Sequence, residues 1–228
     1  MSFGDLTRAA YCPRQLYYAR RADDRSIPAS QRARIDLAFR YSELLEASNG
    51  DLLDHPIDCP ADRYQERLRS LHDGDLEDRF GISWRALVEP TETRTLLTGR
   101  KCHGIAHKVV DDTDAPDVPP IPTIVSPGTP PETGIWEPQT VRAVAAAKAL
   151  AWERQRKIPR ALVEYPAVGI VREATLTVRT VATYRRALRA ARGIDGPPPR
   201  VNDDRCRPCE FREKCGTKTR SLRSRLGL

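Results

Sequence analysis

The sequence is short of lysine and aromatic residues, and it has no long apolar run. Lysine supplies only six of the 38 basic side chains, and aromatic residues make up 6% of the 228 residues. Charged residues, 30% of the chain, interrupt the 39% that are hydrophobic. No run approaches the roughly 18 apolar residues of a membrane helix, yet the chain is apolar enough to build a core.

A secretory signal is not recognisable either. The first residues hold no basic patch followed by a long apolar stretch. We therefore expect a cytoplasmic location and no membrane partner. In that compartment six cysteines favour metal ligands, cluster ligands or core thiols over a disulfide framework.

Charge is unevenly distributed along the chain. Residues 1–138 hold 17 basic and 23 acidic side chains, whereas residues 139–228 hold 21 and 8. A basic segment of this kind attracts polyanions such as DNA. The stretch from Ala174 to Arg192 has no acidic residue, and we predict sequence-independent phosphate contacts there. The arginines proposed to bind DNA are Arg179, Arg185, Arg186, Arg189 and Arg192.

Three aromatic residues of the C-terminal part have two interpretations. Trp136, Trp152 and Tyr184 are able to stack on bases. Buried packing is the interpretation we favour for the two tryptophans.

Hydrophobic periodicity predicts an alternation of helices and strands. The predicted helices cover residues 2–21 with a break near Cys12, then 30–48, 61–72, 137–156 and 180–192. The predicted strands cover residues 94–98, 104–110 and 121–125, and residues 161–165 and 168–178 give two or three more. Seven prolines between Pro116 and Pro131 forbid helix in that region. We expect the strands on either side of Pro166 to form an antiparallel hairpin.

This order predicts an α/β (α+β) fold with a small C-terminal appendage. We divide the chain into a main domain over 1–200, a cysteine segment over 201–216 and a basic tail over 217–228.

Three cysteines lie within ten residues near the C-terminus. The spacing Cys206-x2-Cys209-x5-Cys215 lets the thiolates converge, and the segment is too basic to bury them as apolar thiols. A fourth ligand is then missing. The candidates are Cys12, beside Pro13 at a helix break, and Cys59 and Cys102, which we expect to be core thiols. By spacing alone, tetrahedral zinc and a 4Fe–4S cluster remain equally suitable.

With these features the chain resembles the CRISPR-associated RecB-like exonucleases, a branch of the PD-(D/E)XK nuclease superfamily. The resemblance spans essentially the whole chain. The matching residues are Asp5-Leu6, Tyr11-Cys12-Pro13-Arg14-Gln15-Leu16-Tyr17-Tyr18, Gly134-Ile135-Trp136-Glu137 before an alanine-rich helix, and Cys206-x2-Cys209-x5-Cys215. Its most specific part is the pair of cysteine segments at opposite ends of the chain.

The resemblance implies a restriction-endonuclease-like core, in which helices flank a central mixed sheet. It also implies a 4Fe–4S cluster on Cys12, Cys206, Cys209 and Cys215 that forms a cap joining the two termini. Such nucleases cleave single-stranded DNA ends with Mg²⁺ or Mn²⁺ and help to process new CRISPR spacers. DNA and CRISPR adaptation proteins are therefore the implied partners.

The catalytic positions that the resemblance identifies have changed. The family's Gly-x-x-Asp stretch corresponds to Gly104-Ile105-Ala106-His107, which ends in histidine, a poor Mg²⁺ ligand. The (D/E)-x-Lys positions correspond to Ile124 and Ser126. The family's helix Gln and Tyr correspond to Arg142 and Ala146, and Gln139 lies three residues early.

The absence of the catalytic (D/E)-x-Lys motif does not depend on how the chain is aligned with the family, because the sequence contains no (D/E)-x-Lys at all. The residues two positions before its six lysines are Gly99, Ala106, Ala146, Gln155, Arg212 and Gly216. The family's early-helix histidine is also missing, since residues 30–48 contain none.

We therefore expect a DNA-binding iron–sulfur protein with a nuclease fold that has lost hydrolysis. One alternative is an active exonuclease with a rearranged Mg²⁺ or Mn²⁺ site. It would take carboxylates from Asp111, Asp112, Glu132 or Glu137, and its cation from Lys108 or Arg142. A zinc-stabilised interaction module is the other alternative.

Overall fold

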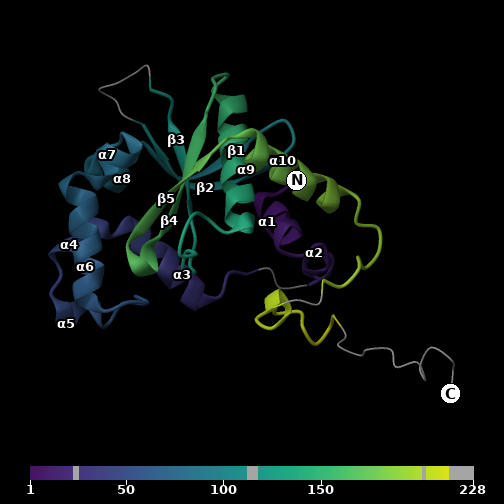
Figure 1. Ribbon diagram of the computed structural model, residues 1–228, viewed down its shortest axis with the longest axis horizontal. Coiled ribbons are helices and arrows are strands. Elements are labelled where there is room, and N and C mark those ends of the chain that lie inside the picture. The colour runs from purple at the N-terminus through teal and green to yellow at the C-terminus, as the bar shows by residue number, and fades with distance from the viewer. Residues whose placement is uncertain (23–25, 112–117, 202–203, 216–228) are drawn as a thin grey trace.

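The computed structural model describes residues 1–22, 26–111, 118–201 and 204–215. A five-stranded mixed sheet forms its centre, with the strands side by side in chain order (Figure 1). All neighbours are antiparallel except β3 and β4, which are parallel. The strands are β1 (Glu92–Thr98), β2 (His103–Val110), β3 (Ile121–Val125), β4 (Arg160–Tyr165) and β5 (Ile170–Thr175).

One long helix connects the two parallel strands, as a parallel pair requires. This helix, α9 (Glu137–Glu153), is rich in alanine and nearly all of its central residues are buried. Two further helices cover the same face of the sheet, α1 (Phe3–Tyr11) and α10 (Val178–Arg192). Gly104 (φ 157°) keeps α1 close to β2, because a Cβ at that position would meet the Phe3 ring at 2.5 Å.

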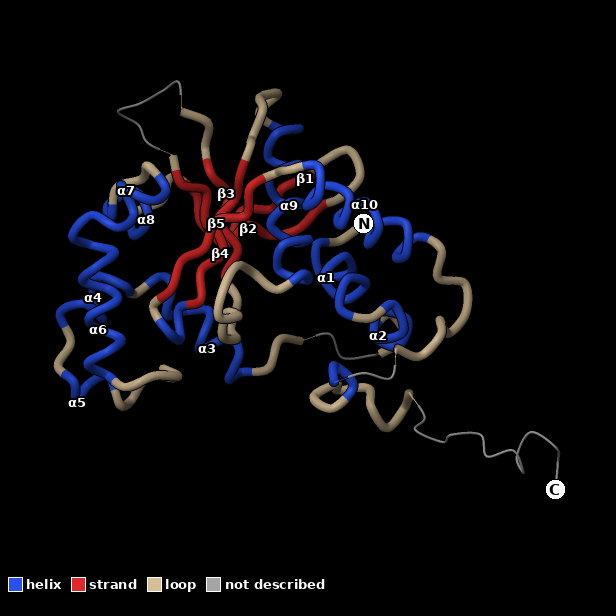
Figure 2. Tube along the Cα trace, in the orientation of Figure 1, coloured by secondary structure: helices blue, strands red, loops and turns tan. Residues whose placement is uncertain are grey.

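Short helices cover the opposite face of the sheet (Figure 2). They bury the strand residues Val110, Ile121, Val125, Leu162 and Val171. These helices are α3 (Ala29–Asp36), η1 (Leu37–Phe39), α4 (Tyr41–Glu46), α5 (Asn49–Leu52), α6 (Ala61–Ser70), η2 (Leu71–Asp75), α7 (Leu76–Phe80) and α8 (Trp84–Val88). The molecule thus has the mixed α/β architecture expected from the order of its elements.

Most predicted elements are confirmed, including all five strands and the antiparallel β4–β5 hairpin. The single helix predicted over 30–48 is wrong. It is divided into α3, η1 and α4, and Arg40 leaves helical geometry at φ −127°. Leu37, Tyr41 and Leu44 are nevertheless all buried in this layer, as their three-to-four spacing predicts.

The expectation that Trp136 and Trp152 lie in the core is wrong. Trp136 is 52% exposed and Trp152 is 50% exposed. Trp136 lies at the N-cap of α9 and its indole N–H donates to the Thr129 carbonyl at 3.0 Å. Both residues lie near the ends of α9, beyond the part that packs on the sheet. Tyr184 of α10, by contrast, is buried.

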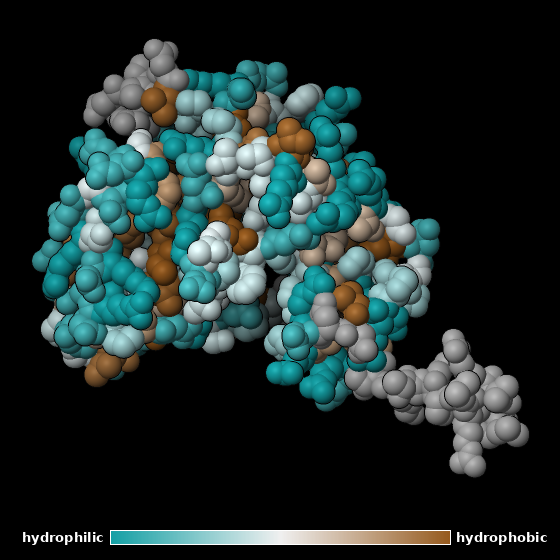
Figure 3. Space-filling view, in the orientation of Figure 1, coloured by the Kyte–Doolittle hydropathy of each residue, from teal (hydrophilic) through white to brown (hydrophobic). Residues whose placement is uncertain are grey.

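On the face shown in Figure 3, hydrophilic residues predominate. Among the described helices, none combines the length and apolar character needed to cross a membrane.

Candidate functional site

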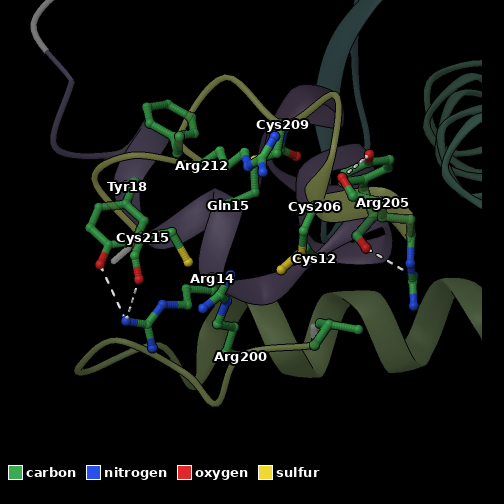
Figure 4. A pocket seen from close by; sticks show the side chains of 13 residues that line it. Cys12, Arg14, Gln15, Tyr18, Arg200, Arg205, Cys206, Cys209, Arg212 and Cys215 are labelled. Carbon is green, nitrogen blue, oxygen red and sulfur yellow. Dashed lines mark hydrogen bonds between the residues drawn. The ribbon is translucent and has the colours of Figure 1, made fainter. Parts of the chain in front are cut away.

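The four predicted cluster cysteines line a single pocket, which we call the cysteine pocket (Figure 4). Cys12 lies in extended backbone between α1 and α2 (Pro13–Ala19), where Pro13 begins the second helix. Cys206 ends η4 (Asp204–Cys206), and Cys209 and Cys215 follow in the turns after it. The pocket encloses about 450 Å³ of space between protein atoms, part of it open to solvent.

Reciprocal hydrogen bonds join the two ends of the chain beside this pocket. The Tyr11 hydroxyl donates to the Arg205 carbonyl at 2.6 Å, and the Arg205 guanidinium donates to the Tyr11 carbonyl at 3.0 Å. Arg14 donates to the Cys215 carbonyl at 3.3 Å. The Tyr18 and Phe211 rings stack with their centroids 6.1 Å apart. The break at Cys12 thus places α2 in contact with the C-terminal segment.

The thiols of the cysteine pocket influence one another. Burial raises the pKa of Cys209, the nearby Cys12 and Cys215 raise it further, and a hydrogen bond from the Phe211 N–H opposes this rise. Ligation requires thiolates, and positive charge at the pocket offsets the cost of forming them. Four arginines line it: Arg14, Arg200, Arg205 and Arg212.

The donor set of the cysteine pocket therefore fits a cluster in residue type, number and surrounding charge. All six cysteines are free thiols. Within the described ranges, no three His, Cys, Asp or Glu side chains are grouped tightly enough to hold one metal ion. Four thiolates are the donor set of both a 4Fe–4S cluster and a tetrahedral zinc ion.

The two remaining cysteines lie away from the cysteine pocket. Cys102 is 2% exposed, and its thiol donates to the Ala145 carbonyl at 3.5 Å. Cys59 is half-buried between the two faces of the core. Cys102 is therefore a core thiol, as expected, whereas Cys59 is only partly buried against the core.

The positions that correspond to the nuclease metal site also come together in space. His107 on β2 accepts a hydrogen bond from the Val125 N–H at Nδ1, 3.0 Å away. Ser126 follows β3, and its hydroxyl lies 3.5 Å from the Gln139 amide of α9. The charge of Arg142, one turn further along α9, acts directly on His107. We call this group, His107, Ser126, Gln139 and Arg142, the substituted site.

The substituted site carries positive charge, whereas a site for a divalent metal ion is lined by negative charge. Burial lowers the pKa of His107 well below its usual value, and the charges of Arg142, Arg94 and Lys108 lower it further, so the ring is neutral at pH 7. Burial also lowers the pKa of Arg142 to about 10. No carboxylate in the described part of the chain pairs with Arg142. Ile124 is completely buried in the core beside α9 and provides no ligand atom.

Lys108, one of the two cations considered for a rearranged site, lies on the opposite face of the sheet. Successive strand residues point to opposite faces, so Lys108 points away from its neighbour His107. Its ammonium lies 2.8 Å from the Glu164 carboxylate, and both side chains are fully buried. The hydroxyl of Thr123 donates to the same carboxylate at 2.7 Å. Lys108 is thus fully engaged by Glu164.

Glu164 is a functional candidate that the sequence patterns do not single out. The available signal is one acidic residue inside the apolar strand Ala161–Tyr165, because a buried acid needs a buried partner. The register Val125↔Glu164 and the pair Lys108↔Thr123 bring these side chains together across β2, β3 and β4.

The carboxylates considered for a rearranged site are dispersed. Asp111 directly follows β2 and is partly buried, and Asp112 lies outside the described residues. Glu132 is exposed in a loop. Glu137 lies in the first turn of α9, as expected for an acid near a helix N-terminus, and pairs with Arg186 at 3.0 Å.

The predicted basic surface forms on α10. The helix packs Tyr184, Ala187, Leu188 and Ala191 inward. All five arginines are exposed, and Arg186 forms the ion pair with Glu137. Among the described residues, no carboxylate pairs with the other four: Arg179, Arg185, Arg189 and Arg192.

Comparison of the chain with known protein families and with curated protein sequences gives no match.

Proposed function

We propose that this protein binds DNA through a nuclease-type α/β fold, carries an iron–sulfur cluster and does not hydrolyse DNA. The observation that carries the proposal is the cysteine pocket. It gathers Cys12 with Cys206, Cys209 and Cys215, although about 190 residues separate the two segments. This is the arrangement implied by the resemblance to the CRISPR-associated RecB-like exonucleases.

The topology of the sheet supports a PD-(D/E)XK-type core. Helix α1 precedes three antiparallel strands, β1 to β3, and α9 then crosses to β4, which is parallel to β3. His107, aligned with the family's metal-binding Asp, accepts a hydrogen bond from the Val125 N–H of β3, and Ser126, aligned with the family's Lys, directly follows Val125 in the chain. Their proximity supports the alignment from which they were chosen.

The chemistry of the substituted site supports the loss of hydrolysis. Mg²⁺ and Mn²⁺ prefer oxygen ligands, above all carboxylates. The residues present are a neutral histidine, a hydroxyl, an amide and a guanidinium. Two positive charges repel each other, so the nearby Arg142 disfavours a divalent cation.

DNA is the proposed polyanion because the exposed face of α10 offers several arginines and no acid. These contacts would be to phosphates and would be independent of sequence. CRISPR adaptation proteins are the proposed class of protein partner. When bound, a 4Fe–4S cluster would link the two ends of the chain through thiolate–iron bonds and hold the C-terminal segment against α2.

The test is to purify the protein anaerobically, record its absorption spectrum and incubate it with end-labelled single-stranded DNA, with and without Mn²⁺. We expect a brown protein that absorbs near 400 nm, binds DNA and leaves it intact. A Cys206→Ser/Cys209→Ser variant controls for contaminating nuclease. A colourless protein with stoichiometric zinc would support the zinc module, and Mn²⁺-dependent cleavage by the protein would show a rearranged active site.

A further inference from the structure

Two exposed tryptophans lie at opposite ends of α9, in different surroundings. Trp136, at the start of the helix, is 52% exposed, and Trp152, in its last turn, is 50% exposed. The indole N–H of Trp136 donates to the Thr129 carbonyl, and the acidic Glu137 follows it directly. Within the described residues, the indole N–H of Trp152 has no such partner. The two side chains are therefore equally exposed, but only Trp136 is held by a hydrogen bond.

Cations surround Trp152. Lys148 precedes it by four residues on α9, so the two side chains share a helix face. The turn between β1 and β2 packs against the same part of the helix, because a Cβ on Gly99 would meet the Ala149 Cα at 2.7 Å. Both residues of this turn are exposed cations, and another exposed lysine follows the helix. We call this group the Trp152 surface; it consists of Arg100, Lys101, Lys148, Trp152 and Lys157.

The positive charge of the Trp152 surface is not compensated. In the part of the chain that the structure describes, no carboxylate pairs with any of its four cations. The acids of the adjoining segments are already engaged: Glu153 accepts a hydrogen bond from the Thr98 N–H, and Glu92 pairs with Arg154. A solvated protein surface usually mixes charges of both signs. A surplus of one sign attracts a polyanion.

The Trp152 surface continues into the basic face of α10 and lies away from the substituted site. The Lys148 ammonium lies 6.0 Å from the centroid of the Tyr184 ring, and Arg185 follows Tyr184 in α10. Arg142 of the substituted site precedes Trp152 by ten residues on α9, which is about 15 Å along a helix. A polyanion held by α10 can therefore reach Trp152 without entering the substituted site.

An exposed indole among unpaired cations suits a single strand of nucleic acid. Unpaired bases stack on aromatic side chains while cations contact the phosphates, and every base offers a face for stacking. In a duplex the bases are stacked on one another, so a residue on a protein surface does not reach their faces. The combination therefore distinguishes single strands from duplexes, whereas the arginines of α10 alone do not.

We propose that Trp152 stacks on a base of single-stranded DNA, and that the four cations of the Trp152 surface contact the adjoining phosphates. The proposal rests on the proposed function, because it specifies the form of DNA that is bound and a second place where the protein holds it. The stacking is independent of sequence, as are the phosphate contacts of α10.

The first test uses Trp152 itself as the probe. The sequence holds three tryptophans, so Trp84→Phe/Trp136→Phe leaves Trp152 as the only one. A base stacked on the indole quenches its fluorescence. The full-length variant is titrated with a single-stranded oligonucleotide, with a duplex of the same sequence, and with an abasic strand of the same number of phosphates. We expect quenching by the single strand and by neither of the other two.

The second test measures affinity by fluorescence anisotropy of a labelled single strand at several salt concentrations. Trp152→Ala should weaken binding about tenfold, as for the loss of one stacked base. It should leave the log–log salt slope unchanged, because it removes no charge, whereas Lys148→Gln should lower that slope by about 0.7. Trp136→Ala is the matched control and should bind like the wild type, since it removes an equally exposed indole from the other end of α9.

The remaining outcomes separate this proposal from the proposed function. If Trp152→Ala binds like the wild type while substitutions on α10 weaken binding, the Trp152 surface is wrong and the DNA-binding function stands. Equal quenching by the abasic strand would also overturn the stacking, since that strand offers no base. If the wild type binds no oligonucleotide, the DNA-binding function itself fails. Should the double tryptophan variant not fold, the affinity test still decides, because it changes only single residues outside the core.

Discussion

The ammonium of Lys108 lies 2.8 Å from the carboxylate of Glu164, and both side chains are completely buried. Lys108 also lies over the Phe39 and Tyr41 rings, 5.5 and 4.9 Å from their centroids. Burial, followed by the negative charge of Glu164, raises the pKa of Tyr41 well above its usual value. The ion pair therefore ties the sheet to the short-helix layer on the face opposite the substituted site.

Breaking this pair should destabilise the protein strongly. Glu164→Gln leaves a buried ammonium without a counter-charge, and we expect a loss of about 3–5 kcal/mol in the free energy of unfolding. The double variant Lys108→Met/Glu164→Gln should cost much less than Lys108→Met or Glu164→Gln alone, because it removes both charges. Urea unfolding of the wild type, the two single variants and the double variant measures the coupling free energy between the two side chains. Additive effects of the single changes would contradict the ion pair.

The neutral His107 predicts a loss of stability in mild acid. Its folded pKa lies well below its unfolded value near 6.5, so below that pH the unfolded state binds more protons than the folded state. Stability from this residue is present above pH 6.5 and is lost as the pH falls, by up to about 1.4 kcal/mol per pH unit.

The variant His107→Asn should show a smaller dependence of stability on pH between 7 and 5, because it does not titrate and keeps an acceptor for the Val125 N–H. Denaturant unfolding at a series of pH values measures the dependence. His103→Asn is the control, since His103 is exposed. Equal pH dependence in His107→Asn and the wild type would mean that His107 has the same pKa in the folded and unfolded states, and would contradict the lowered pKa.

The cysteines should separate into two groups by function. Serine at any of the four positions of the cysteine pocket should lower the absorbance near 400 nm and the iron content of anaerobically purified protein. Cys102→Ala should leave both unchanged, because that thiol lies in the core beside Ala145. The same serine variants should be cut faster by protease after α10, since loss of the cluster releases the C-terminal segment. Unchanged iron in Cys12→Ser would exclude Cys12 as a ligand.

The exposed arginines of α10 should determine the salt dependence of DNA binding. Replacing Arg185 and Arg189 by glutamine should lower the log–log salt slope by about 0.7 for each phosphate of single-stranded DNA that an arginine no longer neutralises. The effect should be the same for unrelated sequences, because phosphates carry no sequence information. Titrations of two oligonucleotides at several salt concentrations test this. A reduction confined to one sequence would indicate base contacts instead.

Local signals were sufficient for most of the secondary structure. The alanine-rich run predicted α9, the proline-bounded apolar segment predicted β3, and Cys12-Pro13 predicted the break between α1 and α2. The same signals failed for residues 30–48. There the apolar spacing fits a single helix, but the backbone leaves helical geometry at Arg40, between η1 and α4.

For the candidate sites too, local sequence signals indicated some residues and the tertiary structure was needed for others. The short spacing from Cys206 to Cys215 indicated ligation from sequence, since close cysteines in a basic segment have few other uses. The resemblance selected Cys12 over Cys59 and Cys102, and the structure places Cys12 in one pocket with the other three cysteines. Glu164 became recognisable only when the strand register placed it against Lys108.

The sequence by itself determined the class of the fold, the cysteine spacing and the absence of any (D/E)-x-Lys, because these depend on residue type and short-range order. Tertiary structure decided which distant residues meet. Pairing across β2, β3 and β4 placed His107 beside α9 and Lys108 on the opposite face, although the two are adjacent in the chain. Strand alternation is a local property, but the partner on each face is supplied by segments tens of residues away.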